Sequence, residues 1–177
     1  LNWPYPTICH AAGNGTSTEF VNHKGFNTLT LGSHDDTAAA MASDSVFRNP
    51  ASTHGDRELP ELAANGISVS AVGLMMSGTS FAAPATAGAT AVIQSVNATL
   101  QSWPEGCRAI LMASAWRNPG GGTWRADLVA GVDARDGSGA LDTQAAVLIA
   151  RSRRSTNAAA TRRGWDVGTI HSGVVDA

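Results

Sequence analysis

Residues 77–88 have the sequence SGTSFAAPATAG, in which one serine, Ser80, is followed four residues later by Pro84. Proline has no backbone N–H, and its ring clashes with the carbonyl group four residues earlier, which here belongs to Ser80. A helix can therefore contain Pro84 only if Ser80 lies in, or just before, its first turn. The N–H groups and the dipole at a helix start favour negative charge, so this stretch predicts a serine placed to act as a nucleophile.

Short strands and longer helices alternate along the rest of the chain. The predicted strands cover residues 6–14, 27–33 and 67–73, and the predicted helices run from Ser80 to about Leu100, over 104–115 and over 143–154. Residues 36–61 and 118–142 are rich in turn residues, and 155–163 have the composition of a linker. The alternation favours an α/β fold with a parallel sheet, whose functional sites gather at the carboxyl ends of the strands.

The composition narrows the choice of partners. The chain has 177 residues, of which 43% are hydrophobic and 15% charged, and its formal net charge is -2. This charge argues against nucleic acid as a partner, and no apolar run is long enough to span a bilayer, so we expect neither nucleic acid nor a membrane. The sequence has neither an initiator methionine nor a signal peptide, and its abrupt start suggests a cut inside a larger protein.

Two cysteines, Cys9 and Cys107, do not make a disulfide framework. One lies in an apolar strand-like run and the other in a helix-like run. We therefore expect two buried thiols rather than a bridge, and the redox compartment stays open.

A second candidate residue, Asn14, lies in the stretch AAGNG at 11–15, at the end of the first predicted strand. Taken singly, each candidate has an ordinary structural explanation. Asn-Gly is a common turn pair, so Asn14 could be a turn residue, and Ser80 could be a helix N-cap.

Together, SGTSFAAPATAG and AAGNG resemble the subtilisin-like serine proteases, and weaker similarities extend the resemblance over roughly residues 6–150. The resemblance implies that Ser80 is the nucleophile, that the Asn14 amide stabilises the oxyanion, and that Ala12 and Gly13 bind substrate. It also implies an incomplete doubly wound parallel sheet with flanking helices, a peptide or protein substrate, and no cofactor. One departure is PELAANG, with Glu61 and Asn65 where aspartate and proline are commoner, in a segment we expect to be a structural loop.

The family's aspartate and histidine motifs, which precede the serine, are not in this sequence. The nearest match to the histidine motif, His54-Gly55-Asp56, is followed by DRELPE rather than by an apolar helix. None of the five histidines, His10, His23, His34, His54 and His171, is expected to act as the base. We therefore expect residues 1–154 to be the C-terminal part of a peptidase domain, inactive alone, with 155–177 a linker and the start of a further segment.

Two other functions stay open: a non-catalytic relative that binds peptides, and an unrelated α/β binding module. If the cut is real, the missing N-terminal part of the domain is itself a partner, and the strand at 6–12 is an unpaired apolar edge through which copies could associate. No metal site is assigned, because Asp133, Asp136 and Asp142 fit a solvated, turn-rich loop. The family resemblance suggests a secreted or periplasmic protein.

Overall fold

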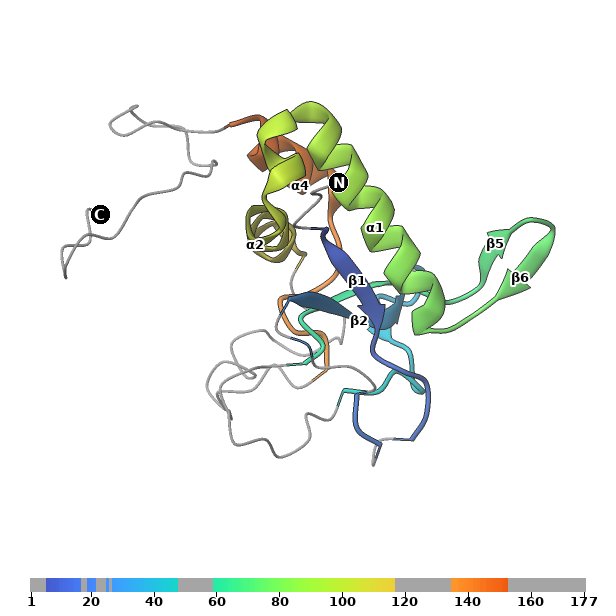
Figure 1. Ribbon diagram of the computed structural model, residues 1–177. Coiled ribbons are helices and arrows are strands. Elements are labelled where there is room, and N and C mark those ends of the chain that lie inside the picture. The colour runs from blue at the N-terminus through green and yellow to red at the C-terminus, as the bar shows by residue number, and fades with distance from the viewer. Residues whose placement is uncertain are drawn as a thin grey trace, which may run out of the picture.

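The structure is a computed structural model, and it describes residues 6–16, 19–21, 25, 27–47, 59–116 and 135–152. A small sheet forms its centre (Figure 1). Three parallel strands, β1 (Ile8–Ala11), β2 (Thr28–Asp35) and β4 (Leu62–Asn65), lie in the order β1-β2-β4. The short strand β3 (Ala40–Met41) pairs antiparallel with the end of β2. The parallel α/β fold expected from the sequence is confirmed.

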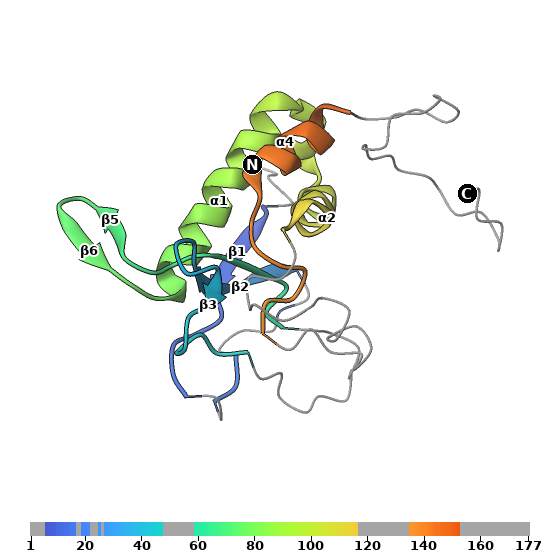
Figure 2. The same cartoon turned by 180° about the vertical axis from the view of Figure 1, so that it is seen from behind.

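Four helical segments complete the described fold: α1 (Thr79–Val96), the 3-10 helix η1 (Ala98–Ser102), α2 (Pro104–Ser114) and α4 (Thr143–Arg151). Helix α1 packs along β1, β2 and β4, while α4 contacts both α1 and α2 (Figure 2). The buried residues of α1 are three or four positions apart, except for one adjacent pair, and all but the last are small: Thr79, Ala82, Thr86, Ala89, Thr90 and Ile93. Small side chains let this helix lie close to the sheet.

One core joins the sheet to the helices. Leu29 and Leu31 of β2 and Leu62 of β4 are at most 1% exposed and pack with Ile93 of α1. Since alternate strand residues share a face, Ser33 of β2 lies on the same face of the sheet, toward the start of α1. This face therefore leads from the apolar core to the turn that carries Ser80.

The later strands were predicted only in part. The stretch at 62–65, expected to be a loop, is the buried strand β4, because its short run of Leu and Ala fits a fully covered parallel strand. The stretch at 67–73 does not join the sheet. Its alternating pattern belongs to β5 (Val69–Ala71), which pairs antiparallel with β6 (Leu74–Met76) in a separate hairpin.

Glu61, just before β4, is buried although it is charged. Its Oε2 accepts the Thr30 N–H at 2.6 Å, and its Oε1 lies 2.5 Å from an Arg108 nitrogen on α2. The carboxylate thus links the sheet to α2, which supports a structural role for the segment PELAANG.

The two thiols are free, as expected. Cys107 is fully buried and Cys9 is partly buried, and burial raises the pKa of both thiols. On the side of β1 away from β2, no strand pairs with it among the described residues. The linker and further segment predicted for 155–177 lie outside the described residues.

Candidate active site

The segment SGTS, at 77–80, forms the start of α1, as Pro84 predicts. Gly78 is the N-cap residue, with φ 140° and ψ 164°, and Ser80 is the second residue of the helix. Pro84 lies inside the same helix, four residues after Ser80, so the Ser80 carbonyl has no helical N–H to accept. The Ser80 side chain is exposed, and none of the described residues hydrogen-bonds its hydroxyl.

Asn14 follows β1 and lies against this helix start. Its Oδ1 accepts the Thr79 N–H at 2.9 Å, and the Gly13 N–H donates to the Thr79 hydroxyl at 3.1 Å. Thr79 is 1% exposed. One buried threonine therefore joins the AAGNG and SGTS segments, with Asn14 and Thr79 65 residues apart in sequence. Asn14 is thus held against Thr79, the residue that precedes Ser80.

These bonds orient the Asn14 amide. A backbone N–H can only donate, so the Asn14 atom that faces Thr79 must be the oxygen, and the NH₂ group points elsewhere. That nitrogen would lie only 2.7 Å from a Cβ built on Gly78. Among the described residues the NH₂ group has no acceptor, so both of its N–H groups are available to a ligand beside the start of α1.

The loop after β1 is anchored on its other side by main-chain hydrogen bonds. The Val46 N–H donates to the Gly13 carbonyl at 3.1 Å, and the Gly15 N–H donates to the Asp44 carbonyl at 2.8 Å. Asn14 itself does not have a positive φ, whereas Gly13 does, at 118°. A left-handed turn is therefore not the reason for an asparagine at position 14, which weakens its explanation as a turn residue.

The two residues predicted to bind substrate precede Asn14 directly. Ala12 is fully buried, and its N–H donates to the Leu31 carbonyl at 2.9 Å. Gly13 is also buried, with its N–H bonded to Thr79. Their contact with substrate stays a prediction.

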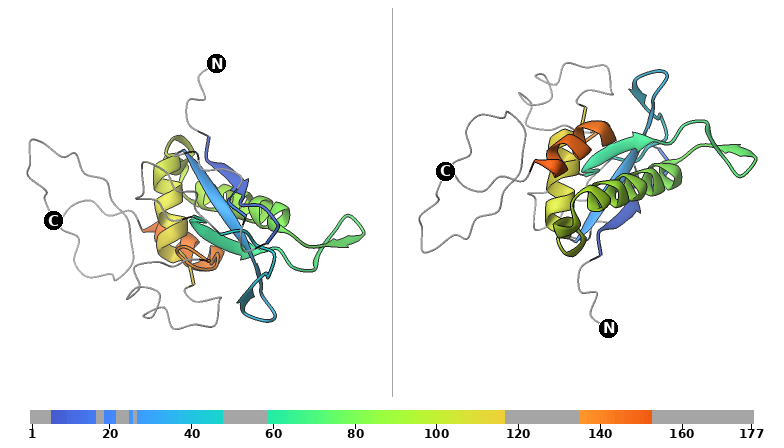
Figure 3. Two further views of the ribbon diagram at one scale, coloured as in Figure 1. Left: turned by 90° about the horizontal axis from the view of Figure 1, so that it is seen from below. Right: turned by 90° about the horizontal axis from the view of Figure 1, so that it is seen from above.

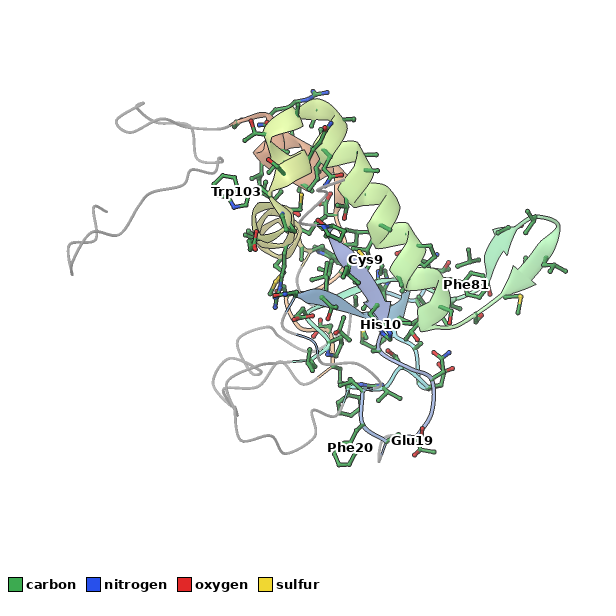
Figure 4. All side chains as sticks on the ribbon, viewed as in Figure 1. Cys9, His10, Glu19, Phe20, Phe81 and Trp103 are labelled. Carbon is green, nitrogen blue, oxygen red and sulfur yellow. The ribbon has the colours of Figure 1, made fainter. Side chains whose placement is uncertain are left out.

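Glu19 closes a short turn beside the segment AAGNG, at 11–15. Its N–H donates to the Thr16 carbonyl at 3.0 Å, and its carboxylate accepts the Thr16 N–H at 3.2 Å (Figure 4). The same carboxylate covers Gly15, where a Cβ would lie 2.2 Å from Oε2. A Cβ at position 15 would displace this exposed carboxylate, and the flexible Glu19 side chain has room to move aside.

Two of the five histidines lie in the described part of the chain. His10 is on β1, and its Nδ1 lies 2.8 Å from the Ala11 carbonyl oxygen. His34, at the end of β2, is 3% exposed, and burial lowers its pKa. Its Nδ1 is 3.3 Å from Asp36 Oδ1 but lacks hydrogen-bond geometry. Neither histidine hydrogen-bonds Ser80, and His23, His54 and His171 lie outside the described residues.

The described residues were searched for groups that could hold a metal ion and for helices that could span a membrane. These residues contain no group of three His, Cys, Asp or Glu that could hold a metal ion. Asp142 caps α4 by accepting the Ala145 N–H at 2.8 Å, Asp136 is buried, and Asp133 lies outside the described residues. None of the described helices is long and apolar enough to cross a membrane.

Comparison with known proteins identifies the class to which this fold and these two motifs belong. The sequence profile of the subtilase family matches residues 7–155. The chain belongs to the subtilase family, and its fold is that of the subtilisin-like serine proteases. A search of curated proteins found no match to the chain.

Solved structures of subtilisin-like proteases share the fold. A mutant of the protease domain of PatA is 23% identical, with a TM-score of 0.56 over 80% of this chain and 46% of that one. The prenylagaramide maturation protease PagA is 24% identical, with a TM-score of 0.55 over 78% and 48%. The epidermin leader peptide processing serine protease EpiP from Staphylococcus aureus is 19% identical, with a TM-score of 0.58 over 84% and 42%. The present chain thus spans less than half the length of each of these three chains.

Proposed function

We propose that this chain is part of a serine endopeptidase in which Ser80 attacks the peptide bond and forms an acyl-enzyme. The Asn14 amide donates a hydrogen bond to the oxyanion of the tetrahedral intermediate. The observation that carries the proposal is the hydrogen bond between Asn14 Oδ1 and the Thr79 N–H, because it holds an unpaired NH₂ group beside the start of α1. The solved relatives named above are proteases, which supports the same chemistry here.

The chemistry needs a general base as well. A serine hydroxyl is a weak nucleophile until a base removes its proton, and a third group usually orients that base. No described residue hydrogen-bonds the Ser80 hydroxyl, and the sequence lacks the family's histidine and aspartate motifs. We propose that these two groups come from polypeptide outside the 177 residues, and that the chain alone does not turn over peptides.

Peptide hydrolysis tests this assignment. We compare the native protein, meaning the polypeptide as purified from its own cells, with residues 1–177 expressed alone, which we call the isolated chain. Ser80→Ala should lower kcat of the native protein by about 10⁶-fold, because the members of a catalytic triad act as one unit. Ser95→Ala, at an exposed serine near the other end of α1, should leave kcat unchanged.

Two results would contradict the proposal. Cleavage by the isolated chain that disappears in Ser80→Ala would place a base among its five histidines. A native protein that binds peptides without cleaving them would favour the alternative of a non-catalytic, peptide-binding subtilase.

A further inference from the structure

The hairpin formed by β5 and β6 projects away from the sheet and the helices (Figure 3). The pairing of Val69 with Met76 and of Ala71 with Leu74 puts these four apolar residues on one face. Leu74 is 60% exposed, Met75 71% and Met76 51%. Residues 67–76 contain no charged side chain. An uncharged, apolar hairpin in water is typical of a surface that binds another polypeptide.

The tip of the hairpin adds a second, independent observation. Val72 is 98% exposed and has φ 47°, and Gly73 follows with φ 78°. Two positive φ values in a two-residue turn favour Asn-Gly or Asp-Gly, and a β-branched residue there is strained. No contact with the described residues offsets the backbone strain at this exposed valine. A contact of the Val72 side chain with polypeptide outside those residues would explain why a valine stands there.

The hairpin is attached directly to the nucleophile turn. The Ser68 N–H donates to the Ser77 hydroxyl at 2.9 Å, and the Gly78 N–H donates to the Gly66 carbonyl at 2.7 Å. A base for Ser80 has to come within about 2.6–3.2 Å of its hydroxyl. Polypeptide that carries such a base therefore has to approach α1 beside the point where the hairpin leaves the body of the protein.

We infer that the β5–β6 hairpin, with its apolar face and Val72, is the docking surface for the polypeptide that supplies the catalytic acid and base. This inference rests on the proposed function. The polypeptide that binds this surface is a different one from residues 1–177. A second copy of this chain would bring neither the aspartate motif nor the histidine motif. The solved relatives have the length for such a partner, since this chain covers only 42–48% of the three described above. The absence of charge fits a permanent rather than a transient interface.

Methionine oxidation measures whether the surface is covered. Dilute hydrogen peroxide oxidises exposed methionines faster than buried ones, and mass spectrometry reports each position. In the isolated chain, Met75 and Met76 should oxidise quickly. In the native protein Met76, which lies on the apolar face, should oxidise at least about tenfold more slowly, as expected for a side chain that becomes buried. Met112 on α2, which packs against the core, should react at the same rate in both and serves as the control.

A cross-link identifies the occupant. Val72 is replaced during synthesis with the photo-reactive amino acid p-benzoylphenylalanine, so the label is present at position 72 whether or not the surface is covered. Irradiation of the labelled native protein should join position 72 to a peptide outside residues 1–177. Leu74→Ser should weaken the Met76 protection by several-fold, whereas Leu148→Ser, at an exposed leucine on α4, should not.

The outcomes separate this inference from the proposed function. Equal oxidation of Met76 in the native protein and the isolated chain overturns the docking surface. Protection of the isolated chain that grows with its concentration, or a cross-link within residues 1–177, overturns it in favour of a second copy or an internal contact. Protection together with a cross-link outside the chain, but without Ser80-dependent hydrolysis, keeps the docking surface and contradicts the proposed function.

Discussion

The two ends of the Asn14 side-chain amide differ: the oxygen is hydrogen-bonded, and the nitrogen is available to a ligand. Its oxygen accepts the Thr79 N–H, and its nitrogen is left without an acceptor among the described residues, next to Gly78. Because the oxygen is already bonded, the amide is oriented before any substrate arrives. A donor that is fixed in advance stabilises a developing oxyanion without reorganising in the reaction, which is why this residue is central to the account.

Replacing Asn14 with alanine in the native protein should lower kcat by about 10²–10³, the size typical of losing one oxyanion donor in a subtilisin, with little change in KM. Asn14→Gly should show the same loss, because glycine also lacks the amide. Steady-state kinetics on both variants, with circular dichroism to confirm folding, provide the measurement. A folded Asn14→Gly variant with normal kcat would remove Asn14 from the site.

Gly78 offers a second test of the same geometry. A Cβ at position 78 would lie 2.7 Å from the Asn14 nitrogen, and φ 140° is strained for alanine. Gly78→Ala should therefore push the amide out of place and lower kcat by an amount similar to that of Asn14→Ala, about 10²-fold or more.

The matched control is Gly88→Ala on the same helix, where an added Cβ meets nothing within 4 Å. This variant should keep normal kcat and gain about 0.5–1 kcal/mol in free energy of unfolding, because alanine is the better helix former. Equal kcat in the two variants would show that the contact between Gly78 and Asn14 has no bearing on catalysis.

The sequence alone could predict the position of Ser80, because the constraint from Pro84 is local. It could not predict Thr79, since the partners of Thr79 lie 65 and 66 residues away and only the folded chain brings them together. The one feature of the sequence that could have pointed to Thr79 is its place directly before Ser80, the proposed nucleophile.

Among the elements, β4 and α2 are joined by a buried ion pair. The Glu61 side chain is 2% exposed and pairs with Arg108, which is 30% exposed. Arg108→Ala would leave a buried carboxylate without its cation. We expect the free energy of unfolding of the native protein to fall by about 3 kcal/mol, the lower end of the usual range, because water reaches the arginine.

Urea denaturation measures this loss. Arg151→Ala, at an exposed arginine that ends α4, should change the free energy of unfolding by less than about 0.5 kcal/mol. Adding Glu61→Gln to Arg108→Ala should recover part of the loss, because the uncompensated charge is removed. An Arg108→Ala variant as stable as Arg151→Ala would show that the pair contributes nothing.

The long helices and the first two strands could be predicted from hydrophobic pattern, because each buries a continuous or periodic run of apolar residues. Strand β4 could not, since its four residues carry a weak signal and its pairing with β2 is a long-range contact. The hairpin was mistaken for a sheet strand because alternation describes any extended segment, whether its apolar face is covered or exposed.

For the molecule as a whole, the proposed catalytic site is divided between this chain and polypeptide outside it. This chain carries the proposed nucleophile, one oxyanion donor and an apolar hairpin next to them, and it spans less than half the length of the related protease chains. Under the proposed function, association of the segments is a condition for activity, because Ser80 would gain its base only when the rest of the site is in place.

Labelling with a fluorophosphonate tests this central claim most directly. These reagents phosphonylate a serine only when a neighbouring base activates it, so peptide mapping of the product reports both the residue and its activation. We predict one label per molecule on Ser80 in the native protein, and no label above background on the isolated chain or on Ser80→Ala. A native protein that stays unlabelled, or that is labelled at a serine other than Ser80, would contradict the account.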